Sequence, residues 1–217
     1  MTPMTCLALA AAAFVGTHFA LSHPLRSPLV ARLGERGFQG VYSLIALATF
    51  GWMIWVYRGL GDQAPLWIAA EVVWIVASLV MWFASILLAG SFAGNPALPG
   101  ARRVQAPGGV LAITRHPMMW SFALWAIVHA VLSATPKALL LDGAILFLAL
   151  GGSVGQDAKK RKLHGEKFHQ WTAQTAFFPF ARGLRAPGTF AFMAGTGLFL
   201  LATWLHPMPV AVWRWTG

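Results

Sequence analysis

Long apolar runs separated by short polar segments dominate the hydrophobic pattern of the chain. The runs predict helices over residues 4–21, 39–57, 66–88, 117–132, 138–154 and 189–205. Charge-poor apolar runs of about 18 or more residues are typical of transmembrane helices. The run at 117–132 is short for a full span, so its N-terminal end is expected among the lipid head groups. The pattern predicts an all-α polytopic membrane protein, a six-transmembrane-helix bundle that forms a single domain over residues 1–217.

Two longer polar segments interrupt the apolar runs. Residues 89–115 are rich in Gly and Pro and are expected to form a cytoplasmic loop, partly ordered against the bundle. Residues 156–180 are basic and amphipathic. Their apolar members, Leu163, Phe168, Trp171 and the cluster Phe177-Phe178-Pro179-Phe180, are expected to lie on the membrane surface.

Composition supports a membrane protein. Hydrophobic residues make up 58% of the chain and charged residues only 10%, whereas soluble domains carry roughly 25% charged residues. Cys6 is the only cysteine, so an internal disulfide and a thiolate metal cluster are excluded. The first run lacks a basic leader and a cleavage pattern, and is interpreted as a retained helix.

The net charge of +10 could suggest nucleic-acid binding, but the positions of the basic residues argue against it. Thirteen of the 16 Lys and Arg lie in three polar segments, at residues 26–36, 102–115 and 159–185. This alternation is the positive-inside pattern, and it predicts cytoplasmic loops, contact with anionic lipid head groups, and both termini outside the cytoplasm.

Ionisable residues inside apolar runs are candidate functional residues, because they are costly in lipid. Glu71 and Asp142 lie near a predicted water interface, where they could be solvated or bound to a neighbouring helix. His18 and His129 lie within apolar runs, and an unpaired neutral imidazole there costs a few kcal/mol. Cross-helix hydrogen bonds could satisfy both rings. Alternatively they bind a metal, and histidines on different helices suit a haem better than a structural zinc site.

A further candidate is Arg115-His116-Pro117, which opens the fourth helix. Proline is favoured in the first helical turn, and the free N–H groups there attract anions, which Arg115 would strengthen. A phosphate, a carboxylate or a haem propionate could bind. The same residues could equally be a positively charged helix end at the interface.

Several motifs carry a resemblance that covers most of the chain. Four motifs of the chain resemble the NnrU family of bacterial membrane proteins and the related 15-cis-ζ-carotene isomerase (Z-ISO). They are His18-Phe-Ala-Leu-Ser-His-Pro-Leu-Arg26, Leu33-Gly-Glu-Arg-Gly-Phe-Gln-Gly-Val-Tyr-Ser-Leu44, Ile113-Thr-Arg-His-Pro117 and Ala126-Ile-Val-His129. NnrU proteins are associated with nitrite and nitric oxide metabolism in denitrification. Z-ISO proteins are haem b enzymes that isomerise a cis double bond of a carotenoid when the iron is reduced and its axial ligation changes.

The resemblance implies a haem b protein of the bacterial inner membrane, with His18 and His129 as metal ligands and catalytic residues. Arg26, Arg115 and His116 would bind propionates or another anionic group. The partner would be a small gaseous ligand such as nitric oxide, or a hydrophobic polyene; if the protein is an enzyme, it would be a haem-dependent cis–trans isomerase. Plant Z-ISO sequences carry a cysteine where this chain has Ala126, so a thiol ligand is absent.

The expected depths of the two histidines leave the ligand pair open. At 1.5 Å per residue, His18 would lie roughly 6 Å and His129 roughly 19 Å from the cytoplasmic boundary. One iron between them needs tilted helices or ligands placed one above the other. Otherwise His18 pairs with His116, or two haems bind.

A weaker resemblance is to isoprenylcysteine and phospholipid methyltransferases, which use S-adenosylmethionine. It rests on Arg115-His-Pro117, Gly165-Glu-x-Phe-x-x-Trp171 and Pro179. The paired acids expected ahead of the Gly-Glu step are missing, because Asp157-Ala-Lys-Lys-Arg161 stands there, and Met119-Trp-Ser121 replaces the usual Tyr-x-Gly. A methyltransferase and a non-enzymatic regulatory membrane protein are the alternative functions.

Overall fold

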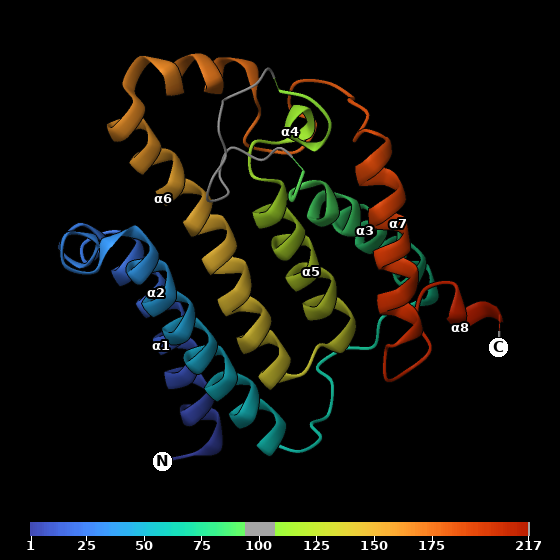
Figure 1. Cartoon of the computed structure of the whole chain (residues 1–217). Coiled ribbons are helices and arrows are strands. Elements are labelled where there is room, and N and C mark those ends of the chain that lie inside the picture. Colours follow the sequence, from blue (N-terminus) through green and yellow to red (C-terminus); the bar gives the residue numbers. More distant parts are fainter. Residues whose placement is uncertain (94–106, 217) are drawn as a thin grey trace. The chain divides into compact units, whose positions relative to one another are not determined.

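The computed structural model describes residues 1–93 and 107–216, and every regular element within these residues is a helix. Figure 1 shows α1 (Pro3–Ser22), α2 (Arg26–Gly59), α3 (Glu71–Gly90), α4 (Val110–Ile113), α5 (Pro117–Ser133), α6 (Pro136–Gln174), α7 (Thr189–Trp204) and α8 (Trp213–Thr216). The predicted all-α fold is confirmed.

Four helices of the described residues are long and apolar enough to cross a membrane: α1, α2, α3 and α6. The apolar helices α5 and α7 are shorter, with 17 and 16 residues. All six apolar runs therefore form helices, and four of them have the length of a span. That all six cross the bilayer stays a prediction.

Three helix bounds differ from those the apolar pattern predicts. Helix α2 begins at Arg26 instead of residue 39, because its charged first turns are helical and only Gly34 leaves helical geometry, at φ 70°. Helix α6 continues to Gln174 instead of ending at residue 154, with a break at Gly165. Helix α3 begins at Glu71 instead of residue 66. In the predicted loop at 89–115, residues 110–113 form α4, and residues 94–106 lie outside the described part.

The late start of α3 has a local cause in the residues before it. The backbone N–H of Leu66 donates to the carbonyl of Ala134 at 2.9 Å, and the indole N–H of Trp67 donates to the carbonyl of Val131 at 2.9 Å. These apolar residues therefore belong to a connection that is bonded to the α5–α6 turn. Hydrophobicity alone does not distinguish such a connection from a helix end.

The chain forms two compact units. The first contains Met1–Ile68 with His129–Gly155, and the second contains Ala69–Val128 with Gln156–Gly217. In the first unit, α1 packs along α2. Aromatic rings near the end of α1 also lie against glycines of α6: a Cβ on Gly151 would lie 2.9 Å from the Phe19 ring, and one on Gly155 would lie 2.5 Å from the His23 ring. Small residues let helices approach this closely in a membrane protein.

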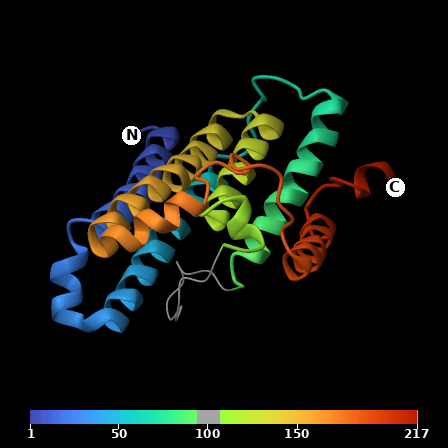
Figure 2. The ribbon, with the colours of Figure 1, turned by 90° about the horizontal axis from the view of Figure 1, so that it is seen from above.

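In the second unit, α3 and α7 lie side by side (Figures 1 and 2). A Cβ on Gly195 would lie 2.4 Å from the Cα of Ile86, so only glycine fits at this crossing. The indole N–H of Trp82 donates to the hydroxyl of Thr196 at 2.9 Å, beside the same contact. The two helices are thus held by close backbone approach and one interhelical hydrogen bond.

We expect Gly195→Ala to lower the thermal midpoint of the purified protein relative to Gly197→Ala on the same helix. Both changes gain about 1 kcal/mol of helix propensity, but a Cβ at residue 197 meets nothing within 4 Å. Overpacking at Gly195 costs about 1–3 kcal/mol. Thermal unfolding in detergent measures the difference, and equal midpoints for the two variants would contradict this packing.

Candidate functional site

The His18 ring has a defined orientation on α1. Its Nδ1 lies 2.7 Å from the carbonyl oxygen of Phe14, one turn earlier. A carbonyl can only accept, so Nδ1 carries the proton, and in the neutral ring Nε2 then bears a lone pair. The ring lies edge-on to those of Phe14 and Tyr42, at centroid distances of 4.5 and 5.5 Å. A backbone carbonyl bond of this kind orients metal-binding histidines.

An apolar groove of about 320 Å³ runs between α1 and the first half of α6 in the first unit. Small side chains form much of its walls. It is lined by Ala8, Ala11, Ala12, Val15, Leu139, Leu140, Gly143, Ala144 and Phe147. His18 lies one turn beyond Val15 on α1, where its ring contacts Tyr42 of α2, and the neighbouring Phe19 meets α6 at Gly151.

The other predicted ligand, His129, also belongs to the first unit. It is half-buried on α5, four residues before the end of that helix, and Ala126 lies fully buried one turn earlier. Arg26 begins α2, where its Nη2 lies 2.6 Å from Oε1 of Glu35 and its guanidinium lies 5.4 Å from the Phe38 ring centroid. Arg26 is therefore already paired, across the helix break at Gly34.

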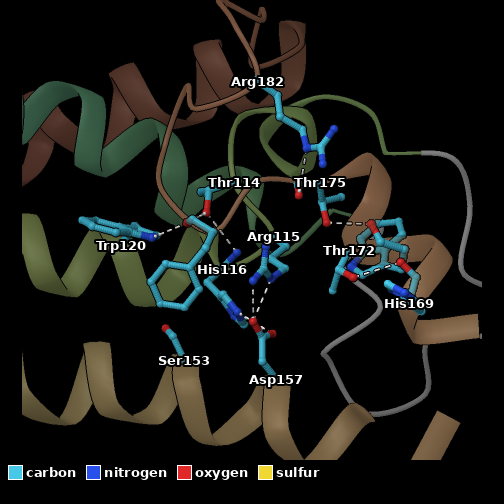
Figure 3. A network of polar contacts seen from close by, with 12 residues as sticks. Thr114, Arg115, His116, Trp120, Ser153, Asp157, His169, Thr172, Thr175 and Arg182 are labelled. Carbon is cyan, nitrogen blue, oxygen red and sulfur yellow. Dashed lines mark hydrogen bonds and ion pairs between the residues drawn. The ribbon is translucent and has the colours of Figure 1, made fainter. Parts of the chain in front are cut away.

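The remaining predicted residues meet in the second unit (Figure 3). Oδ2 of Asp157 accepts from Nε and Nη2 of Arg115 at 2.8 and 2.6 Å. Oδ1 lies 2.9 Å from Nε2 of His116, and because an ionised carboxylate only accepts, this nitrogen carries the proton. His116 is 4% exposed and Asp157 is 7% exposed. These three residues form a buried polar cluster, which we call the Asp157 cluster.

A strap formed by residues 175–188 is bonded to the chain around this cluster. The Thr114 hydroxyl and the Trp120 indole N–H both donate to the carbonyl of Phe177, at 2.7 and 2.8 Å. The backbone N–H of Arg115 donates to the carbonyl of Ala176 at 2.8 Å, and that of Phe180 donates to Ile113 at 3.1 Å. The strap thus covers the start of α5 with fixed geometry.

The sequence singled out Arg115 and His116 but not Asp157. The sequence pattern places Asp157 in a basic surface stretch, yet its carboxylate is the partner of both residues. The available signal was a single acid at the end of an apolar run, followed by four basic residues, Lys159-Lys-Arg-Lys162. Since an unpaired acid next to a span is costly, such a residue indicates a basic partner elsewhere in the chain.

The electrostatics of the Asp157 cluster follow from its burial. Burial lowers the pKa of His116, and the adjacent Asp157 carboxylate only partly opposes this effect. The folded protein therefore holds His116 neutral near pH 7. Arg115 balances the charge of Asp157, so a propionate or phosphate at this place would have to share the Arg115 guanidinium with that carboxylate.

The two acids of the apolar runs have different surroundings. Both carboxylate oxygens of Glu71 accept from Arg214, each at 3.1 Å, and Oε1 also accepts from the Trp215 indole at 2.7 Å. Glu71 is therefore bound by a neighbouring helix, one of the two roles expected for it. Asp142 is 3% exposed within α6, so it is not solvated.

We expect Asp157→Asn to destabilise the protein by about 3–5 kcal/mol, because it leaves the Arg115 charge buried without a counter-charge. The exposed Glu166 lies on the same helix, and Glu166→Gln serves as the control. Chemical unfolding in detergent measures both. If the two variants were equally stable, the buried ion pair would not contribute as described.

The His116 titration gives a further prediction. Its pKa is lower in the folded than in the unfolded chain, so its contribution is complete above about pH 6.5 and is lost as the pH falls. Between pH 7 and 5 the thermal midpoint should drop more for the native protein than for His116→Gln. An equal or smaller drop in the native protein would show that His116 does not titrate this way.

Comparison with known proteins identifies the family. The family model described as NnrU protein matches residues 6–214, which is nearly the whole chain. No curated protein and no solved structure matches it significantly. The matched region contains α1 to α7, the His18 ring, the groove and the Asp157 cluster. With this coverage, and with apolar helices long enough to span a membrane, the chain belongs to the NnrU family of membrane proteins.

Proposed function

We propose that this NnrU-like membrane protein binds haem b, with His18 and His129 as axial ligands. Function would depend on redox-controlled ligation of the iron, either with nitric oxide in nitrogen-oxide metabolism or in cis–trans isomerisation of a carotenoid-like polyene. The observation that carries the proposal is the His18 ring, whose Nδ1–H is bonded to the Phe14 carbonyl. This bond leaves the Nε2 lone pair of the neutral ring as a metal ligand.

The described residues fit a porphyrin better than a metal ion bound by side chains alone. They contain no group of three or more His, Cys, Asp or Glu that could hold an ion. A porphyrin brings its own in-plane nitrogen ligands and needs only axial imidazoles and apolar walls. The first unit has both kinds of feature, since α1 carries His18 and an apolar groove lies between α1 and α6.

His129 suits the second axial position better than His116. The Nε2 of His116 is engaged by Asp157 at 2.9 Å, and its ring is fixed within the Asp157 cluster. Using His116 as a ligand would disturb a buried ion pair. In this proposal His116 has a structural role. Together with Arg115 it would contact an anionic group only at the edge of the cluster.

When bound, haem would supply a one-electron couple, and exchange of one of the two histidines would give a gas or a polyene access to the iron. The chain's own residues would set the ligand field. The Phe14 carbonyl increases the basicity of His18 through the Nδ1–H bond. Phe14 and Tyr42 restrict rotation of the ring by their edge contacts, and the alanines of α1 leave room for a flat group.

We expect the detergent-purified protein, reconstituted with haemin, to show a Soret band that shifts on dithionite reduction. His18→Ala and His129→Ala should each change or abolish this band, and added imidazole should restore it by filling the vacated ligand site. His169→Ala is the matched control, because His169 is exposed on α6 outside the spans. A colourless protein, or unchanged spectra in both ligand variants, would overturn the proposal.

A methyltransferase is the second candidate, and one observation favours it. The methyltransferase resemblance rests on Arg115-His-Pro117, Gly165-Glu-x-Phe-x-x-Trp171 and Pro179. Residues 176 and 177 are bonded to Arg115 and Thr114, next to Pro179, and Phe168 and Trp171 pack with Leu111, so these stretches lie near one another. However, Asp157 is bound by Arg115 and His116 and is not free for a cofactor. Calorimetric titration with S-adenosylmethionine separates the two: heat of binding in a colourless protein supports the methyltransferase.

A further inference from the structure

The strap exposes two large apolar side chains although its backbone is firmly held. Phe178 is 61% exposed and Leu184 is 88% exposed. Their neighbour Phe180 points inward, with its ring stacked on that of Phe83 at 5.2 Å. The strap backbone on both sides of Phe178 is bonded to Ile113, Thr114, Arg115 and Trp120. Phe178 is therefore presented by a fixed scaffold.

Exposed cations lie on the strap itself and on the helix segment that precedes it. The second half of α6, residues 156–174, carries exposed Arg161, Lys162 and Lys167, and the strap carries exposed Arg182 and Arg185. Residues 156–188 hold seven Lys and Arg against two acids, which gives a net charge of +5. One of those acids, Asp157, is buried and paired with Arg115, so it does not neutralise the exposed side.

The apolar part of α6 determines where these cations lie relative to the membrane. The apolar part of α6 is long enough to span a membrane, and the same helix continues into the basic residues. At Gly165 (φ 49°) the helix breaks, and the following turns bury Phe168 and Trp171 against Leu111. The cations therefore begin where an apolar span ends, at the level of lipid head groups.

We propose that residues 156–174 and the strap form a docking surface for anionic phospholipids. The exposed Lys and Arg would bind the phosphates of the head groups, and Phe178 and Leu184 would enter the boundary between head groups and acyl chains. Basic residues beside apolar ones on an otherwise solvent-exposed surface are the combination that anionic bilayers attract. A nucleic acid would use the cations but would leave Leu184 and Phe178 unexplained.

Lipid retention measured by native mass spectrometry tests the cations. From an equimolar mixture of phosphatidylglycerol and phosphatidylcholine at low salt, the native protein should retain phosphatidylglycerol with at least about threefold enrichment. The triple variant Lys162→Ala, Lys167→Ala, Arg185→Ala should bring this ratio close to one. The charge-conserving variant Lys162→Arg, Lys167→Arg, Arg185→Lys should keep it. No enrichment in the native protein, or full enrichment in the alanine variant, would overturn the proposal.

Spin labels test the apolar residues. Cys6 is the only cysteine, so Cys6→Ser gives a background for Phe178→Cys and Leu184→Cys, with the exposed Asp62→Cys as a water-accessible control. In phosphatidylglycerol bilayers, both strap labels should be less accessible than the control to a water-soluble relaxing agent. Equal accessibility would overturn the proposal. So would binding of a short RNA, in a phosphatidylcholine nanodisc, that the alanine variant abolishes, because it would assign the cations to nucleic acid.

Discussion

A single buried carboxylate joins the start of α5 to the second half of α6 within the second unit. Asp157 is 7% exposed and accepts hydrogen bonds from Arg115 and His116. An isolated charge there would cost several kcal/mol, and the pair is tolerated because both carboxylate oxygens have partners. This fixes the start of α5 against α6. The position of the strap is fixed in turn, because Thr114 and Trp120 both donate to the Phe177 carbonyl. These two residues flank Arg115 and His116 in the sequence.

Where no charged residues are present, close approach at glycines holds the helices together. Lipid offers no hydrophobic driving force between apolar helices, so packing and a few hydrogen bonds must hold them. At the α3–α7 crossing the Cβ-free Gly195 meets Ile86, and in the first unit Gly151 and Gly155 receive the rings of Phe19 and His23. Gly151, Gly155 and Gly195 therefore act as contact surfaces, whereas Gly34 and Gly165 serve as backbone breaks.

The helical class of the fold could be predicted because apolar runs of span length have one stable form in lipid. The ends of the helices could not be predicted. The first turns of α2 and the last turns of α6 are charged and yet helical. Conversely, Leu66 and Trp67 are apolar but belong to a connection. The local bond from His18 to Phe14 follows helix geometry. The Asp157 pair joins residues 42 apart in sequence, and no local pattern encodes such a contact.

The site residues thus divide by chemistry. His18 holds its Nδ1–H on the Phe14 carbonyl, which leaves Nε2 of the neutral ring with a lone pair, whereas Arg115 neutralises an internal acid to which His116 also donates. The groups that were expected to bind the anionic edge of a cofactor are therefore also the groups that stabilise the fold. The pairing with Asp157 explains why this basic motif at the start of α5 is largely buried.

The most direct test of the Asp157 pairing is a double-mutant cycle with Arg115→Met and Asp157→Leu, read as the free energy of unfolding in detergent. Each single change leaves one charge buried and unpaired, while the double variant replaces both with apolar side chains. We predict that the double variant is more stable than either single variant, with a coupling of at least about 2 kcal/mol. Additive losses in the double variant would contradict the central role of this pair.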